Sequence, residues 1–148
     1  MALSVEAPEG IFGKTPRDFR IDKKNREKLQ KIKRFLKIKE DKECVMFCSA
    51  LGKIFEIREP IKKPHHVFNL DTKDVGYFLL LVSQNLLKRV KNKENPSEIA
   101  QELLSRDKII HISEEYANGG INWIYQKIVE NPEKDPIILL KELIEDIN

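Results

Sequence analysis

SEEYANGGINWIY, residues 113–125, is the stretch of sequence that decides the predicted fold. It holds two of the three tyrosines, the only tryptophan and the only Gly-Gly pair of the chain. Asn-Gly-Gly is typical of a helix that ends in a left-handed residue, because glycine accepts a positive φ without steric cost. We therefore predict a helix corner here, with positive φ at one of the two glycines. The residues of this corner are Tyr116, Asn118, Gly119, Gly120 and Trp123.

Helical periodicity extends from the corner in both directions. Apolar side chains recur every three or four residues, and Asp, Asn and Pro stand where helices begin. We predict helices over residues 23–37, 41–55, 71–91, 96–106, 107–118, 121–129 and 135–147. The expected fold class is all-α: a compact bundle of about six to seven helices, with an irregular basic N-terminal arm over residues 1–21 and a single helical domain over 22–148. Residues 56–70 form a basic connector with a short extended piece at 67–68.

Composition sets outer bounds on this fold. The chain has 148 residues, enough for one domain with a core, and its 41% hydrophobic content excludes a disordered chain. Cys44 and Cys48 lie four apart in an apolar run, which favours reduced core residues over a disulfide or a metal site. No apolar run reaches 18 residues, and the N-terminus lacks a basic region before an apolar one. We expect a cytoplasmic protein with no membrane partner.

The charge is distributed unevenly along the chain. Residues 14–42 carry 13 Lys and Arg against 5 Asp and Glu, a local net charge of +8, whereas residues 94–148 carry 5 against 12, a local −7. A basic segment of this kind attracts polyanions by releasing counterions from phosphates, although it is equally typical of a solvated helix face. The candidate nucleic-acid-binding residues are Arg17, Arg20, Lys23, Arg26, Arg34, Lys37, Lys62, Lys63 and His66.

Motifs that would indicate catalysis or a cofactor are missing from the sequence. It contains no phosphate-binding glycine loop, no dinucleotide-binding glycine motif and no H-E-x-x-H zinc motif. His65 and His66 are adjacent, but neighbours on an extended chain point to opposite sides, and no spaced Cys or His pair accompanies them. We expect no cofactor, no metal and no catalytic residue, with a metal-dependent nuclease as the least favoured alternative. The aromatic residues of the corner could stack on bases, but their acidic surroundings favour a packing role.

Two short pieces of the chain resemble a known family. They are Ala50-Leu51-Gly52, at the end of an apolar helix, and Glu114-Glu115-Tyr116-Ala117-Asn118-Gly119-Gly120. Both are similar to motifs of the small accessory proteins encoded with bacterial DNA phosphorothioation systems, those of the associated protein 4 type. The resemblance covers roughly residues 20–130 and leaves the first arm and the last helix outside. It departs from the family at Cys44 and Cys48, where we would expect small or aliphatic residues.

The resemblance implies a role beside enzymes that install sulfur in DNA or restrict DNA by that mark, and it implies no catalytic residue. We therefore predict a non-enzymatic accessory subunit of a phosphorothioation-linked defence system. It would contact the DNA backbone, independent of sequence, through its basic N-terminal half, and partner proteins of the same system through its acidic C-terminal half. A homo-oligomer is a further assembly that the sequence allows. The alternative function is a protein-interaction or regulatory module without nucleic-acid contact.

Overall fold

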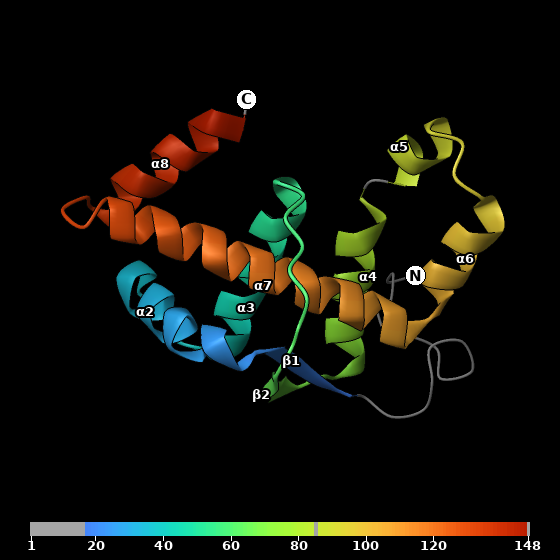
Figure 1. Cartoon of the computed structure of the whole chain (residues 1–148), viewed down its shortest axis with the longest axis horizontal. Helices are drawn as coiled ribbons and strands as arrows, with labels where there is room; N and C mark the ends of the chain where they lie inside the picture. The colour runs from blue at the N-terminus through green and yellow to red at the C-terminus, as the bar shows by residue number, and fades with distance from the viewer. Residues whose placement is uncertain (1–16, 85, 148) are drawn as a thin grey trace, which may run out of the picture.

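One long helix, α7 (Arg106–Glu130), runs through the middle of the molecule, and the other elements gather around it (Figure 1). The computed structural model describes residues 17–84 and 86–147. In chain order they form β1 (Asp18–Asp22), the 3-10 turn η1 (Lys23–Asn25), α2 (Arg26–Leu36), α3 (Asp41–Ile54), β2 (Pro64–Asn69), α4 (Thr72–Ser83), α5 (Leu86–Lys91), α6 (Pro96–Leu104), α7 and α8 (Pro136–Ile147). The predicted helical fold is confirmed in outline, with a two-stranded sheet added to it.

The predicted helix corner is wrong. Helix α7 continues without interruption through Asn118, Gly119 and Gly120, and neither glycine has a positive φ. The two glycines instead allow the main chain of α3 and of the residues after it to lie close to α7. A Cβ on Gly120 would lie 1.8 Å from the carbonyl oxygen of Cys48 in α3, and a Cβ on Gly52 would lie 2.0 Å from the carbonyl oxygen of Tyr116. Real Cβ atoms essentially never come within 3.0 Å of such atoms, so α3 and α7 cross where only glycine fits.

The last part of the predicted irregular arm is a strand. Residues 1–16 lie outside the described residues, but β1 pairs antiparallel with β2, with Phe19 opposite Phe68 and Ile21 opposite His65. Phe19 and Ile21 are fully buried, while Asp18 and Arg20, which alternate with them along the strand, are partly exposed, as in a strand with one face on the core. The extended piece predicted at residues 67–68 belongs to β2.

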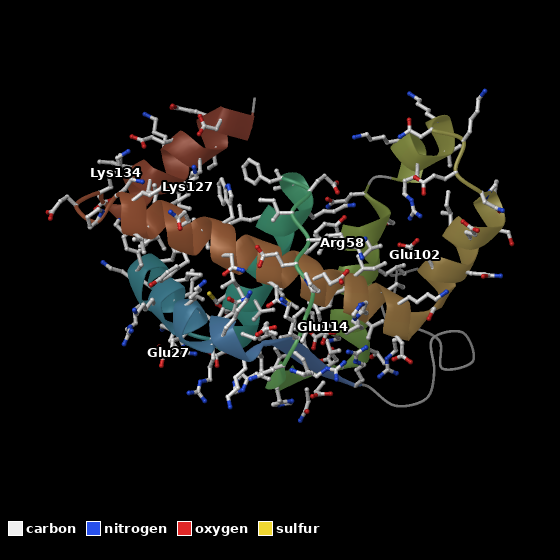
Figure 2. All side chains as sticks on the ribbon, viewed as in Figure 1. Glu27, Arg58, Glu102, Glu114, Lys127 and Lys134 are labelled. Atoms are coloured by element: carbon white, nitrogen blue, oxygen red, sulfur yellow. The ribbon has the colours of Figure 1, made fainter. Side chains whose placement is uncertain are left out.

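A row of polar side chains on α7 holds this strand and α2 in place. Glu114, Asn118 and Asn122 are spaced by four, so they lie along one face of the helix, and Figure 2 shows Glu114 pointing toward the sheet. Glu114 accepts from Arg17 Nη2 at 2.8 Å and from the backbone N–H of Arg20 at 2.7 Å. Asn118 accepts from the backbone N–H of Asp22 at 3.0 Å and from Asn25 Nδ2 at 2.9 Å. Asn122 accepts from Lys28 Nζ at 2.8 Å. Buried polar groups without such partners would destabilise the fold.

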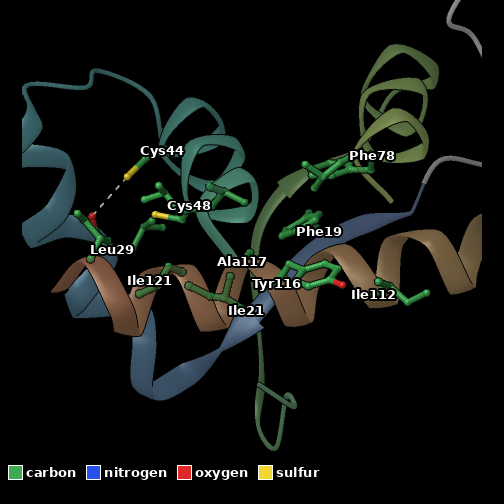
Figure 3. Close-up of a cluster of buried hydrophobic side chains, with 14 of the residues drawn as sticks. Phe19, Ile21, Leu29, Cys44, Cys48, Phe78, Ile112, Tyr116, Ala117 and Ile121 are labelled. Carbon is green, nitrogen blue, oxygen red and sulfur yellow. Dashed lines mark hydrogen bonds between the residues drawn. The ribbon is translucent and has the colours of Figure 1, made fainter. Parts of the chain in front are cut away.

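The hydrophobic core lies between α7 and the elements that cover it (Figure 3). Phe19 from β1 stacks on Phe78 from α4 at 4.8 Å between ring centroids, and both rings are fully buried. Cys44 and Cys48 are also fully buried and free, which confirms their prediction as core thiols. The core therefore joins β1, near the start of the described chain, to helices from its middle and end.

Local capping explains several helix boundaries and corrects others. The Asp71 side chain accepts from the backbone N–H of Asp74, and the Asp74 side chain accepts from the backbone N–H of Asp71, so the two residues form a capping box at the start of α4. Asn95 caps α6. Helix α7 begins after Ser105, not at the predicted Asp107. Helix α4 ends at Ser83, so the helix predicted over residues 71–91 is two helices.

Candidate nucleic-acid interface

A buried carboxylate, Asp22, gathers exposed lysines from two distant segments. Its side chain is 4% exposed and accepts hydrogen bonds from the backbone N–H groups of Lys62 (2.7 Å), Lys63 (3.4 Å) and Lys24 (3.1 Å). The backbone N–H of Lys23 in turn donates to the carbonyl of Lys63 at 2.7 Å. All four lysine side chains are exposed, so the residues that follow β1 and the residues that precede β2 present four cations at one place.

The charge of Asp22 is maintained by these bonds. Burial alone would raise the pKa of this carboxyl, but the backbone N–H donors of Lys62, Lys24 and Lys63 lower it below its ordinary value. The carboxylate therefore stays ionised at neutral pH and can hold both lysine-bearing segments.

A groove on α2 continues the basic surface. It has a volume of about 330 Å³ and is lined by Arg26, Glu27, Gln30, Lys31, Arg34 and His65. Arg26, Gln30 and Arg34 follow one another at intervals of four residues, which places them on one face of α2. His65 reaches this groove because β2 pairs with β1 just before α2 begins.

We call the exposed cations of these two places together the basic face: Lys23, Lys24, Arg26, Lys31, Arg34, Lys62 and Lys63. Figure 2 shows nitrogen-tipped side chains along α2 and beside the sheet. Glu27 is the carboxylate that lines the groove among them. The basic face therefore concentrates positive charge on one part of the surface, a feature that attracts polyanions.

The structure places four of the predicted binding residues elsewhere. Arg17 and Arg20 lie against Glu114, which is fully buried, with nitrogen–oxygen distances of 2.8 and 3.5 Å. His66 faces Asp18 at 3.1 Å on the sheet. Lys37 ends α2 at a φ of 58° and lines a small hollow beside the start of α8. Of the nine predicted residues, the structure therefore brings together Lys23, Arg26, Arg34, Lys62 and Lys63.

Three residues of this surface were not predicted. Lys31 stands five residues after Arg26 and three before Arg34, so helical spacing could have identified it. Lys24 follows Lys23 in η1 and is exposed beside it. His65 carried no usable signal, because its place depends on the pairing of β2 with β1.

Tyr116 and Trp123, which were predicted to belong to a helix corner, join α7 to the residues that follow α3. Tyr116 donates from its hydroxyl to Glu56 at 3.1 Å, and burial raises the pKa of Tyr116 to about 12. Trp123 stacks on Phe55 with 4.3 Å between ring centroids. These rings pack within the protein, in agreement with the packing role predicted for them.

The described part of the chain was predicted to hold no metal site and no membrane-spanning segment. Among residues 17–84 and 86–147, no group of three or more His, Cys, Asp and Glu side chains is arranged to hold a metal ion. In the same residues, no helix is both long and apolar enough to cross a lipid bilayer.

Comparison with known proteins identifies one family. Neither the curated proteins nor the solved structures contain a match to this chain. One family model matches residues 22–147, and its description is DNA sulphur modification system-associated protein 4. The match includes α8, which the resemblance of the two short motifs had left outside. The chain thus belongs to the family of DNA sulphur modification system-associated protein 4.

Proposed function

We propose that this protein is a non-enzymatic accessory subunit of a DNA sulphur modification system and that its basic face contacts the DNA backbone. The family supports the association with the modification system. The observation that supports DNA contact is the basic face itself, where the bonds of Asp22 and one face of α2 hold seven exposed cations together. A part in defence against foreign DNA belongs to the same proposal.

The proposed contact is with phosphates rather than with base edges. The cations lie on α2, in the turn η1 before it and in the bend that precedes β2, and Lys and Arg side chains reach phosphate oxygens without reading sequence. Each phosphate neutralised on B-DNA contributes a slope of about −0.9 to the dependence of log K on log salt concentration. We therefore expect affinity that is independent of sequence and falls steeply as salt is added.

A salt titration tests this proposal. Fluorescence anisotropy with a duplex oligonucleotide at several NaCl concentrations should show binding that weakens linearly on the logarithmic plot. The double variant Arg26→Gln with Arg34→Gln removes two cations of the α2 groove and should reduce the slope by about two. Lys141→Gln is the control, because Lys141 is an exposed lysine on α8 that lines neither the α2 groove nor the Asp22 cluster. No binding at low salt, or an equal slope in the double variant, would overturn the proposed DNA contact.

A second candidate function is protein interaction without nucleic acid. Helix α8 exposes three large aliphatic side chains, Ile137 at 76%, Ile138 at 52% and Ile144 at 61%, in the acidic half of the chain. Exposed aliphatic groups with charged neighbours are typical of a protein-binding surface. A pull-down with the other proteins of the modification system, using the chain and its Ile137→Lys, Ile144→Lys variant, tests this candidate. Partner binding that the variant loses, together with indifference to DNA, would favour it over the first proposal.

A further inference from the structure

Helix α8 carries two apolar stripes, and only one of them is buried in the core. Leu139 and Leu143 are spaced by four residues and belong to the hydrophobic core. Ile137 and Ile144 are seven residues apart, so they lie two turns from each other on one face, and both are strongly exposed. Leu140 lies between them and is half-buried. We call Ile137, Leu140 and Ile144 the outer stripe of α8.

The spacing of the outer stripe is that of a contact between two helices. Intervals of three and then four residues correspond to the a and d positions of a coiled coil, where apolar side chains face a second helix. A helix that only covers its own core needs one apolar stripe, with polar residues on the opposite face. The outer stripe is therefore suited to a contact with a further helix.

A hollow lies at one end of this stripe. It has a volume of about 180 Å³ and lies where the end of α2 meets the start of α8, and Figure 1 shows both at the same end of α7. An apolar cavity of about 150 Å³ holds a benzene molecule, so this hollow has room for one large aliphatic side chain. The apolar residues of its lining are Phe35, Leu36, Pro136, Ile137 and Leu140.

The charges at the two ends of the stripe are opposite in sign. Lys37 is exposed at the edge of the hollow, whereas Glu145 and Asp146 are exposed directly after the last residue of the stripe. Asp135 also lines the hollow, but its carboxylate accepts the backbone N–H of Ile137 at 2.9 Å, at the start of α8. One end of the stripe thus offers a hollow with a basic edge, and the other offers an exposed isoleucine followed by two carboxylates.

These two ends fit each other across a two-fold axis. The hollow and Ile144 are separated by up to two turns of α8, roughly 10 Å, so in an antiparallel pair of α8 helices each Ile144 lies opposite the other copy's hollow. Glu145 and Asp146 then approach the partner's Lys37, which is electrostatically favourable. An isologous interface uses the same patch on both subunits, and this patch contains both halves of such a contact. We propose that the outer stripe and its hollow form a homodimer interface, with a second copy of this chain as the occupant.

The proposed contact is small, because each copy contributes one helical stripe and one hollow. Small interfaces belong to weak or transient complexes, so we expect a reversible dimer with a Kd on the order of 10 μM. Helix α2 carries both the edge of the hollow and the groove of the basic face, so the dimer would carry two basic faces. The dimer itself does not depend on DNA contact.

Sedimentation equilibrium of the full chain tests the dimer. Over loading concentrations from about 1 to 300 μM, the molar mass should rise from the 17.3 kDa of the monomer toward twice that value. Ile144→Lys removes the group that enters the hollow and places a cation near the partner's Lys37, so it should weaken the dimer at least about tenfold. Ile138→Lys is the matched control, because Ile138 is an exposed isoleucine of α8 about 100° around the helix from Ile137, and it should dimerise as the wild type does.

An exchange of charges tests the antiparallel pairing. Lys37→Glu should weaken the dimer, and addition of Glu145→Lys to the same chain should restore part of the lost affinity, because the two opposite charges have only changed places. No recovery on this addition would overturn the antiparallel pairing. The double variant Arg26→Gln with Arg34→Gln should dimerise as the wild type does, so the dimer can stand even if the proposed DNA contact fails.

Three other results would contradict the proposed dimer. They are a chain that stays monomeric at every concentration, a dimer that Ile144→Lys leaves unchanged, and a dimer that Ile138→Lys weakens equally. A monomeric chain that binds another protein of the modification system through the outer stripe would also overturn the dimer, and it would favour the second candidate function. Circular dichroism of each variant checks that it is folded, as we expect because both isoleucines are exposed.

Discussion

Substitution of Gly120 by alanine measures how closely α3 and α7 cross. The added Cβ would lie 1.8 Å from the Cys48 carbonyl oxygen, and a tolerated separation is at least 3.0 Å. The two helices would have to separate by about 1.2 Å at their crossing. Overpacking of this kind costs about 1–3 kcal/mol, and we expect the upper end, because the obstacle is the main chain of another helix.

Helix propensity acts in the opposite direction. Alanine within a helix is favoured over glycine by about 1 kcal/mol, so the expected net loss in the free energy of unfolding is about 2 kcal/mol. For a chain of this size, that loss lowers the melting temperature by roughly 4–8 °C. Thermal and urea unfolding, followed by circular dichroism at 222 nm, would measure both quantities.

Two variants on the same helix serve as comparisons. In Gly119→Ala the new Cβ would meet the carbonyl oxygen of Ile57 at 2.1 Å, but Ile57 lies in the connector after α3, which can shift more readily than a helix. We expect a smaller loss for Gly119→Ala than for Gly120→Ala. Lys108→Ala, at an exposed position, should change stability by no more than about 0.5 kcal/mol. A Gly120→Ala variant as stable as the wild type, or more stable, would refute the close crossing.

Two further predictions concern buried groups near the start of the chain. Asp22→Asn should lower the free energy of unfolding at pH 7 by about 2 kcal/mol, because the charged acceptor of the Lys24 and Lys62 N–H groups is lost. Since the folded-state pKa of Asp22 is lowered, this difference should be present above the ordinary Asp pKa and should decrease as pH falls through the folded value. Urea unfolding at pH 7 and at a series of lower pH values would measure it, and a difference that stays constant over the series would contradict it. Cys44 and Cys48, both fully buried, should react with a thiol reagent only after denaturation, and rapid labelling of the native protein would contradict this.

The helices of the fold were largely accessible from sequence, because their signals are local. The capping residues at Asp71 and Asn95 and the apolar stripe of α2 depend on neighbours within one or two turns. The central error at Gly119 and Gly120 has the opposite origin. Locally, Asn-Gly-Gly favours a helix end, and the continuation of α7 depends on α3 crossing it, a contact between residues about 70 apart in the chain. At these glycines the packing of α3 against α7 outweighs the local preference for a helix end.

The candidate site likewise contains residues that the sequence could assign and residues that it could not. Arg26 and Arg34 could be assigned to one exposed face because both belong to one helix. Arg17 and Arg20 could not be separated from them, because their ion pairs are with Glu114, more than 90 residues later.

The polar row on α7 also has a consequence for synthesis of the chain. Glu114 and Asn118 bind β1 across 94 and 96 residues, so the first strand cannot reach its final partners until α7 has been translated. At about 5–20 residues per second, that interval is on the order of ten seconds. During it, Phe19 and Ile21, fully buried in the finished protein, have no α7 to cover them. The nascent chain should therefore be a substrate for ribosome-associated chaperones, and truncation before α7 should produce an aggregating fragment.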